Sequence, residues 1–250
     1  MITSPFKPHP TIKAPTPEQV AALVRLHGRE GAAKICAELE EKRLEAMRKE
    51  KEDPFRFGYV PPHWKKARAL LKKHRELLIL GGNRAAKSRF SAWHLMNEMV
   101  AKPDSRWWCF HSNLIKSVSE QQPAIFDYIP REWKEVKKDR YTNVSFTQKN
   151  GFSDGTFILP NRAQCFFFTY EMDKGKTIEG GEIDGFWCDE LVPMDWLETL
   201  FFRIVTRKGW ALTTFTPVEG YTPTVGGYLD GAITEEEEEA DLLPIYGKVA

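Results

Sequence analysis

The sequence predicts an α/β domain with a largely parallel central sheet, preceded by a helical N-terminal segment. Short apolar runs at residues 77–80, 106–110, 165–170, 183–188 and 210–215 alternate with helical or polar stretches, which is typical of βαβ units. One of these runs leads through a glycine-rich turn into a helix pattern, and another ends in two adjacent carboxylates. Polar groups at strand ends direct attention to the carboxyl edge of the sheet, where α/β proteins bind ligands.

Composition sets the broad class. The 250 residues, 42% of them hydrophobic, suffice for one sizeable domain with appendages or for two small ones. Lys plus Arg number 36 and Asp plus Glu 35, so the overall charge gives no electrostatic footprint for nucleic acid or for a membrane surface. The longest apolar runs are far shorter than a bilayer span, and the first residues have no apolar signal region. We therefore expect a soluble, cytosolic protein.

The four cysteines predict neither a metal site nor disulfides. Cys36, Cys109, Cys165 and Cys188 are widely spaced, and no CxxC pair or histidine stands at metal-site spacing. Three of them lie inside apolar runs. Buried, reduced thiols are the expected state.

Residues 1–53 are expected to form a flexible leader and N-terminal helices. Residues 1–16 carry several prolines and no apolar periodicity. Thr16, Pro17 and Gln19 then give a capping-box signature for a helix. Gly28 and Gly31 should interrupt this helix, and a charged second helix over 32–51 should end before Pro54. The basic excess over residues 1–80 is interpreted as a solvated helix face rather than a DNA-binding one.

The turn after the first apolar run has the pattern of a phosphate-binding loop. That pattern is Gly, four residues, Gly, Lys and Ser or Thr, because backbone N–H groups wrap a phosphate while the lysine and hydroxyl reach phosphate oxygens and magnesium. The matching residues are Gly81, Gly82, Asn83, Arg84, Ala85, Ala86, Lys87 and Ser88. Ala86 stands where the second glycine is expected. The alternative is an ordinary strand-to-helix turn with a solvated Lys87.

The segment that follows the loop reads as a helix over 88–101. Phe90, Trp93, Asn97 and Val100 fall on one face, and Pro103 ends the pattern. A strand, a loop and a helix in this order are what the phosphate cradle requires.

A second motif, "IDGFWCDE" at 183–190, is an apolar strand that ends in two carboxylates. In P-loop NTPases we expect such a strand beside the P-loop strand, with Asp189 holding magnesium directly or through water. Glu190 should project to the other side of the strand end, where it could activate water as a general base. Taken alone, Asp189 could instead be the N-cap of a helix in "LVPMDWLETL". A third strand, in "GWALTTFTPVEGYTPTV", places Thr213, Thr214 and Thr216 at the same sheet edge.

Together these motifs resemble the large subunit of bacteriophage terminases, the ATP-driven DNA-packaging motors of tailed phages. "GGNRAAKS" is similar to their Walker A loop, "IDGFWCDELVP" to their Walker B strand with its catalytic glutamate, and "LTTFTPVEGYT" to their coupling motif. The resemblance covers roughly residues 54–228, and "DPFRFGYVPPHWKKAR" is similar to the approach segment before the ATPase core.

The resemblance implies an ATPase domain of the additional-strand (ASCE) P-loop type over 54–228, with ATP and Mg²⁺ as cofactors. Lys87 would bind the β and γ phosphates, and Ser88 and Asp189 would hold the metal. Glu190 would activate water. Arg84 would sense or stabilise the γ-phosphate, and the strand-end threonines would couple hydrolysis to movement. Arg140 or Arg162 is a candidate to act across a subunit boundary, although exposure alone explains both.

The resemblance also implies partners and a setting. These are double-stranded DNA, the portal protein, the terminase small subunit and a ring of identical chains that works at the prohead in the host cytoplasm. Residues 229–250 are expected to form an acidic segment or the start of a linker or lid, and no nuclease domain or DNA cleavage is expected of this chain. Two alternatives stay open, namely another nucleic-acid-dependent P-loop ATPase such as a helicase, and a non-hydrolysing nucleotide-binding assembly protein, which Ala86 favours.

Overall fold

The computed structural model describes residues 14–172, 178, 180–217, 222–230 and 248–249. The chain divides into two compact units, Met1–Val60 and Pro61–Ala250. Residues 1–13 of the leader expected over 1–16, and the acidic stretch "TEEEEEADLLP", lie outside the described residues.

The first unit contains helices α1 (Pro17–Glu52) and α2 (Pro54–Phe57). The predicted capping box is confirmed: the Gln19 N–H donates to Thr16 Oγ1 at 3.3 Å, and the Thr16 N–H donates to Gln19 Oε1 at 2.9 Å. Gly28 breaks the helix with φ 70° and ψ 173°, as predicted, because glycine takes a positive φ without steric cost. The second expected break is wrong, since residue 31 continues the helix.

The second unit is built on a mostly parallel sheet. All five predicted runs form strands: β1 (Glu76–Leu80), β2 (Arg106–His111), β6 (Gln164–Thr169), β7 (Gly185–Asp189) and β8 (Trp210–Phe215). Two short strands at the sheet edges were not predicted, β5 (Thr156–Ile158) and β9 (Lys248–Val249). In the described residues the strand order is β5-β6-β2-β7-β8-β1-β9, and the β5–β6 pair is antiparallel. Strands β3 (Phe146–Thr147) and β4 (Gly151–Phe152) form a separate antiparallel pair.

The strand order corrects one expectation. The acidic strand β7 does not lie beside the P-loop strand β1, because β8 pairs in parallel with both and separates them. An extra strand at this position is what the additional-strand type of P-loop fold contains, so the predicted fold class is confirmed while the predicted neighbour is wrong.

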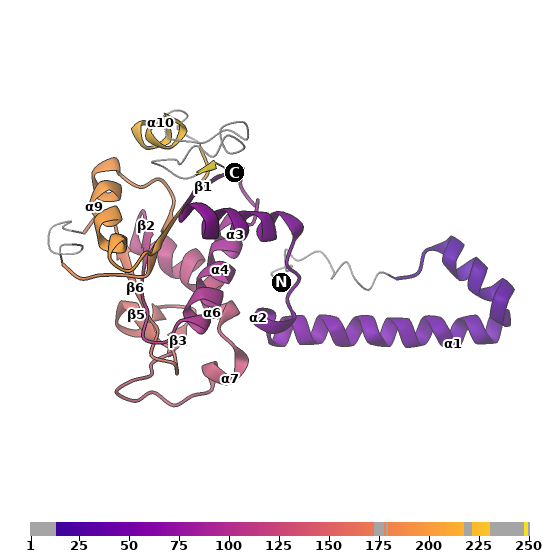
Figure 1. The fold of residues 1–250 in the computed structure, drawn as a ribbon. Helices are drawn as coiled ribbons and strands as arrows, with labels where there is room; N and C mark the ends of the chain where they lie inside the picture. Colours follow the sequence, from indigo (N-terminus) through magenta and orange to yellow (C-terminus); the bar gives the residue numbers. More distant parts are fainter. Residues whose placement is uncertain (1–13, 173–177, 179, 218–221, 231–247, 250) are drawn as a thin grey trace. The chain divides into compact units, whose positions relative to one another are not determined.

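Helices cover both faces of the sheet. Those that lie in the described residues are α3 (Pro62–His74), α4 (Lys87–Ala101), α5 (Leu114–Lys116), α6 (Gln122–Tyr128), α7 (Arg131–Lys134), α9 (Met194–Val205) and α10 (Pro223–Asp230). A π-helical turn, Ser117–Gln121, joins α5 to α6, and a 3₁₀ turn, Ser153–Gly155, joins β4 to β5. Figure 1 shows α4 and α6 on one side of the sheet and α9 on the other.

Helix α4 is more deeply buried than its apolar pattern suggested. Every residue from Phe90 to Met96 is buried, whereas two members of the predicted face, Asn97 and Val100, are only half-buried. The reason is that α4 lies between layers: it packs on β8 and on α6, and its outer side meets Trp64 of α3. A helix enclosed in this way buries more than one stripe.

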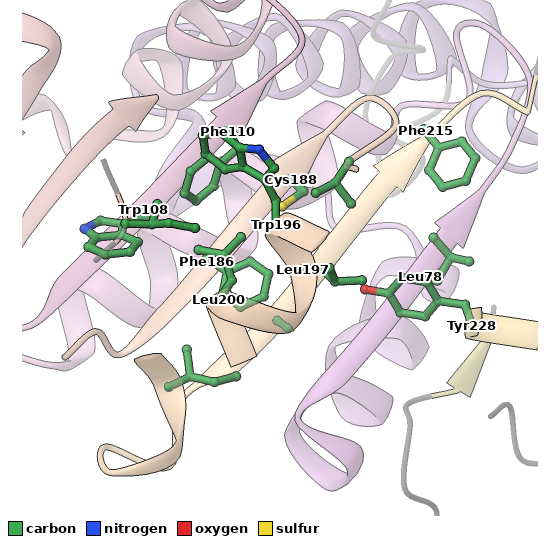
Figure 2. Close-up of a cluster of buried hydrophobic side chains, with 14 of the residues drawn as sticks. Leu78, Trp108, Phe110, Phe186, Cys188, Trp196, Leu197, Leu200, Phe215 and Tyr228 are labelled. Carbon is green, nitrogen blue, oxygen red and sulfur yellow. The ribbon is translucent and has the colours of Figure 1, made fainter. Parts of the chain in front are cut away.

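The opposite face of the sheet holds an aromatic and aliphatic core under α9. Phe110, Phe186 and Cys188 project from the strands toward Trp196 and the leucines of α9 (Figure 2). The Phe110 and Trp196 rings meet edge to face, with centroids 5.9 Å apart. This packing holds β2, β7 and β8 rigidly together, so their carboxyl ends form a fixed platform for the site.

The cysteines are reduced, as predicted. Cys109, Cys165 and Cys188 are buried in the sheet, and Cys36 is half-buried in α1. Within the described residues, no helix is both long and apolar enough to cross a bilayer.

Candidate nucleotide-binding site

The predicted site residues meet at the carboxyl edge of the sheet. In the parallel register Thr214 of β8 lies between Ile79 of β1 and Asp189 of β7. The P-loop leaves β1 at Gly81, directly after the last strand residue. The two motifs that are about 100 residues apart in sequence therefore come together through β8.

The loop has the backbone of a phosphate cradle. Arg84 and Ala86 have positive φ angles, 66° and 60°, and Ala86 immediately precedes the first residue of α4. A side chain at Gly81 would crowd Ala85, whose Cβ lies 3.3 Å from the ideal Cβ position. Loop residues 82–86 are exposed, and the N-terminus of a 15-residue helix opens onto them. Such an arrangement favours an anion, because the first backbone N–H groups of a helix have no intrahelical acceptor and the helix dipole attracts negative charge.

The Lys87 side chain contacts both the P-loop and the residue that follows β8. Its Nζ donates to the carbonyl oxygens of Gly81 and Gly82 at 2.8 and 3.1 Å, and to Thr216 Oγ1 at 3.0 Å. Burial lowers the pKa of Lys87, while the charges of Asp189 and Glu190 act in the opposite sense. Lys87 is therefore not merely solvated.

Asp189 is a buried carboxylate that receives hydroxyl hydrogen bonds. Ser88 Oγ donates to Oδ2 at 2.9 Å, and Thr214 Oγ1 donates to Oδ1 at 2.8 Å. Burial raises the pKa of Asp189 to about 6, although these two hydrogen bonds partly offset the effect. The helix-cap alternative is wrong, because α9 begins at Met194 and its N-cap is Pro193.

The donor set suits magnesium. Mg²⁺ prefers hard oxygen ligands and is commonly bound by one or two protein oxygens together with substrate phosphates and water. Ser88 and Asp189 place a hydroxyl and a carboxylate oxygen 2.9 Å apart beside the loop. No group of three or more His, Cys, Asp or Glu able to hold a metal by itself occurs in the described part of the chain. A metal here would thus need the phosphates as further ligands.

Glu190 directly follows the strand at a backbone bend. Its φ is 72°, and its N–H donates to the Thr214 carbonyl at 2.8 Å, which extends the β7–β8 ladder by one residue. The side chain is half-buried, and no described residue gives it a hydrogen bond or an ion pair. The carboxylate can therefore accept a hydrogen bond from water.

The strand-end threonines have three different partners. Thr213 Oγ1 lies 2.8 Å from the Tyr228 hydroxyl of α10, and Thr214 donates to Asp189. Thr216 Oγ1 receives a hydrogen bond from Lys87 and donates to Asn83 Oδ1 at 3.3 Å. Strand β8 and the residue that follows it are thus hydrogen-bonded through side chains to the P-loop, the acidic strand and α10.

The candidate arginines are placed differently from one another. Arg84 is an exposed residue of the loop itself. Arg162 lies in the turn before β6, at the amino edge of the sheet, and pairs with Asp104 at 2.8 Å. Arg140 is exposed, with its guanidinium 5.7 Å from the Tyr141 ring centroid.

Sequence reasoning missed Trp187 and Tyr228, which contact two of these threonines. Trp187 Nε1 donates to Thr214 Oγ1 at 2.9 Å. The signal was present for Trp187: it precedes Asp189 by two residues in a strand, so both side chains lie on one face. No comparable signal identified Tyr228, because its contact depends on where α10 packs.

Sequence comparison finds no matching protein family and no matching curated protein. Structural comparison does find relatives. The ATPase domain of the Thermus phage P74-26 large terminase matches with a TM-score of 0.51 at 17% identity, over 71% of this chain and 74% of that one. The chain has the fold of a phage large-terminase ATPase domain.

A second match agrees with the first. The large terminase of another thermophilic bacteriophage gives a TM-score of 0.51 at 16% identity, over 75% of this chain and 46% of the phage protein. The part of that terminase that matches is thus just under half its length. At identities this low, the likeness to the large-terminase ATPase domain concerns the fold, and the chemistry has to be argued from the site.

Proposed function

We propose that the chain is an ATP-hydrolysing motor domain of a phage terminase large subunit, which drives double-stranded DNA into the prohead. The observation that carries the proposal is the meeting of Lys87, Ser88 and Asp189 at the mouth of one loop, within a large-terminase ATPase fold. A chance strand-to-helix turn would not bring a buried carboxylate from a distant strand to the serine of the loop.

Nucleotide binding would use groups that are already in place. The loop N–H groups and the N-terminus of α4 would bind the phosphates, and Lys87 would exchange its carbonyl partners for β and γ phosphate oxygens. Arg84 is close enough in sequence to reach the γ-phosphate from the same loop. Magnesium, held by Ser88 and Asp189, would neutralise charge on the phosphates.

Hydrolysis would rest on Glu190. The carboxylate accepts a proton from a water molecule as the water oxygen attacks the γ-phosphorus, and the bond to the β–γ bridging oxygen breaks to give ADP and phosphate. A group with no competing partner among the described residues is suited to this role. Thr214, whose carbonyl accepts the Glu190 N–H and whose hydroxyl contacts Asp189, is well placed to respond to the chemistry.

The coupling proposal follows from the position of β8. Thr216 contacts the lysine that would bind the γ-phosphate, while Thr213 contacts Tyr228 of α10. Loss of the γ-phosphate would change the partners of Lys87, and a rigid strand would transmit that change to α10. Hydrolysis is therefore proposed to be linked to DNA movement by Thr213, Thr214 and Thr216. The motor would work as a ring of identical chains on the portal protein, and the terminase small subunit would deliver the DNA.

Phosphate release from ATP, with and without magnesium, tests the proposal. Wild type should release phosphate slowly in magnesium, with a rate per chain that rises with protein concentration if neighbouring chains complete the site. Lys87→Ala should lower turnover by about 10³-fold, since a charge-assisted phosphate contact has no substitute nearby. Lys149→Ala is the control, because Lys149 is an exposed residue of the turn between β3 and β4, outside the site.

Turnover of Lys87→Ala within a few-fold of wild type would contradict the ATPase assignment. Tight ATP binding by wild type without any phosphate release would instead favour a non-hydrolysing assembly protein. The left-handed conformation of Ala86 is the observation that favours a non-hydrolysing assembly protein as a second candidate. Unwinding of duplex DNA by the purified chain would favour a helicase-like motor.

A further inference from the structure

We propose that Trp187 is a positioning residue for the magnesium-binding carboxylate, acting through Thr214. The indole N–H fixes the Thr214 hydroxyl so that its single hydrogen points at Asp189. The inference rests on the proposed function of the site and adds to it a residue that belongs to neither the loop nor the acidic strand end.

The contacts form one directed chain. Trp187 Nε1 donates to Thr214 Oγ1 at 2.9 Å, and Thr214 Oγ1 donates to Asp189 Oδ1 at 2.8 Å. Trp187 and Thr214 are fully buried, and Asp189 is 5% exposed. Because these groups are buried, bulk water competes little for the two hydrogen bonds.

The direction of the chain follows from the chemistry of the groups. An indole Nε1–H can only donate, and a hydroxyl has one hydrogen to give. With Trp187 as donor, Thr214 Oγ1 must accept, and its hydrogen is then available for the carboxylate. Without the indole, the hydroxyl hydrogen could rotate about the C–O bond, away from Asp189 and toward the side that the indole N–H occupies. The tryptophan thus removes an alternative state of the threonine.

The two carboxylate oxygens of Asp189 therefore have different partners. Oδ1 is committed to Thr214, and Oδ2 faces Ser88, the other proposed metal-binding group. Hydrogen bonds to the outer oxygen of a metal-binding carboxylate hold it in one rotamer, and loss of such outer contacts commonly weakens metal binding by about 10- to 100-fold.

The sheet explains why a tryptophan can do this. Trp187 and Asp189 are two residues apart in β7, so they lie on the same face, and Thr214 of β8 is in register with Asp189. The long indole spans the diagonal from its own position to the neighbouring strand. A phenylalanine at 187 would fill nearly the same volume without the N–H.

The structure supplies a matched control in Trp107 of β2. Its side chain is also buried in the sheet, and its Nε1 also donates to a hydroxyl, Ser105 Oγ, at 2.7 Å. That contact lies at the amino edge of the sheet, away from the P-loop. Trp107→Phe therefore removes the same chemical group from the same layer without touching the site.

The test measures binding of a fluorescent ATP analogue as magnesium is titrated, beside binding in EDTA. Trp187→Phe should raise the half-saturating magnesium concentration by about 3- to 10-fold and leave the affinity in EDTA within about twofold. Trp107→Phe should change neither quantity. Both variants should lose similar thermal stability, which separates a general packing loss from the positioning effect.

Thr214→Val interrupts the same chain from its middle and serves if the tryptophan variant does not fold. It should reproduce the magnesium effect, and the double variant should show little further change, since the two groups act as one unit. An unchanged magnesium requirement in both single variants, or an equal change in Trp107→Phe, would overturn the inference alone. Binding of the analogue by wild type without any magnesium dependence would overturn the proposed metal site and the inference with it.

Discussion

Strand β7 has a buried aspartate at each end, and the two are compensated in different ways. Asp184, just before the strand, is 2% exposed and has Lys102 Nζ at 2.6 Å, Arg207 Nη1 at 3.0 Å and the Arg106 N–H at 2.7 Å. Asp189, the last residue of the strand, is 5% exposed. Its partners among the described residues are two hydroxyl groups, with no lysine or arginine in an ion pair.

The difference separates a structural carboxylate from a functional one. A buried charge is costly unless it is paired, and Asp184 forms ion pairs with two protein cations, Lys102 and Arg207. Asp189 has the same burial without that compensation, so the pKa of its carboxyl is raised to about 6. A buried carboxylate at a ligand-binding edge that lacks a protein cation is suited to receive a cation with the ligand.

The largest expected effect is a loss of ATP hydrolysis at the carboxyl edge of the sheet, with ATP binding retained. Glu190→Gln should lower ATP turnover by about 10²- to 10⁴-fold and keep ATP affinity within a few-fold, because an amide cannot take the proton from water. Steady-state phosphate release and analogue titration measure the two quantities. The control is Glu182→Gln, since Glu182 lies before the strand and pairs with Arg207 at 3.7 Å. An equal loss of binding in Glu190→Gln would point to a metal or folding role.

The next effect is a loss of stability caused by a substitution at the amino edge of the sheet, with nucleotide binding unchanged. Asp184→Asn should lower the free energy of unfolding by about 3 kcal/mol, because it leaves Arg207 and Lys102 without their buried partner. Urea denaturation at neutral pH measures this change. The magnesium dependence of nucleotide binding should match wild type. A loss of that dependence would mean that the two ends of β7 are not independent.

The third prediction concerns the pH dependence of Asp189. Its pKa is about 6 in the folded protein against 3.8 for the ordinary carboxyl, so the folded state holds the proton more tightly. The contribution of Asp189 to the stability of the metal-free wild type should therefore fall as pH rises from about 4 through 6. Asp189→Asn lacks this loss, and its stability relative to wild type should grow by about 2 kcal/mol between about pH 4.5 and 7.5. Denaturation in EDTA at both pH values measures it, and a constant difference would contradict the raised pKa.

The smallest expected effect comes from relief of backbone strain in the P-loop. Ala86 has φ 60° and ψ 24°, where its methyl group costs about 1 to 2 kcal/mol that glycine avoids. Ala86→Gly should raise stability by about 1 kcal/mol and tighten ATP binding by up to about tenfold if the cradle becomes easier to form. Ala85→Gly, one residue earlier in the same exposed loop and without a positive φ, is the control. Weaker binding in Ala86→Gly would show that alanine is already accommodated.

Much of the fold could be predicted from local pattern. Five continuous apolar runs became five strands, because strands of a parallel sheet are buried on both faces. The capping box at Thr16 and the break at Gly28 followed from backbone chemistry. The P-loop and the acidic strand end each have a fixed order of residues that local geometry explains.

The rest depends on long-range packing. The expectation that β7 lies beside β1 is wrong because strand neighbours depend on how connections cross the sheet, and no single segment encodes this. The enclosure of α4 between the sheet and other helices also lay beyond a one-face helix pattern. The contact of Trp187 with Thr214 requires the β7–β8 register, which appears only once both strands are placed.

A single binding assay compares the two ends of β7 and tests whether Asp189 is the metal-binding carboxylate. Affinity for a fluorescent ATP analogue is measured in magnesium and in EDTA, at a temperature where all three proteins are folded, for wild type, Asp189→Asn and Asp184→Asn. We expect magnesium to tighten binding by at least about tenfold in wild type and in Asp184→Asn, and to have little effect in Asp189→Asn. Full magnesium dependence in Asp189→Asn would show instead that the carboxylate at the carboxyl edge is not the metal-binding group.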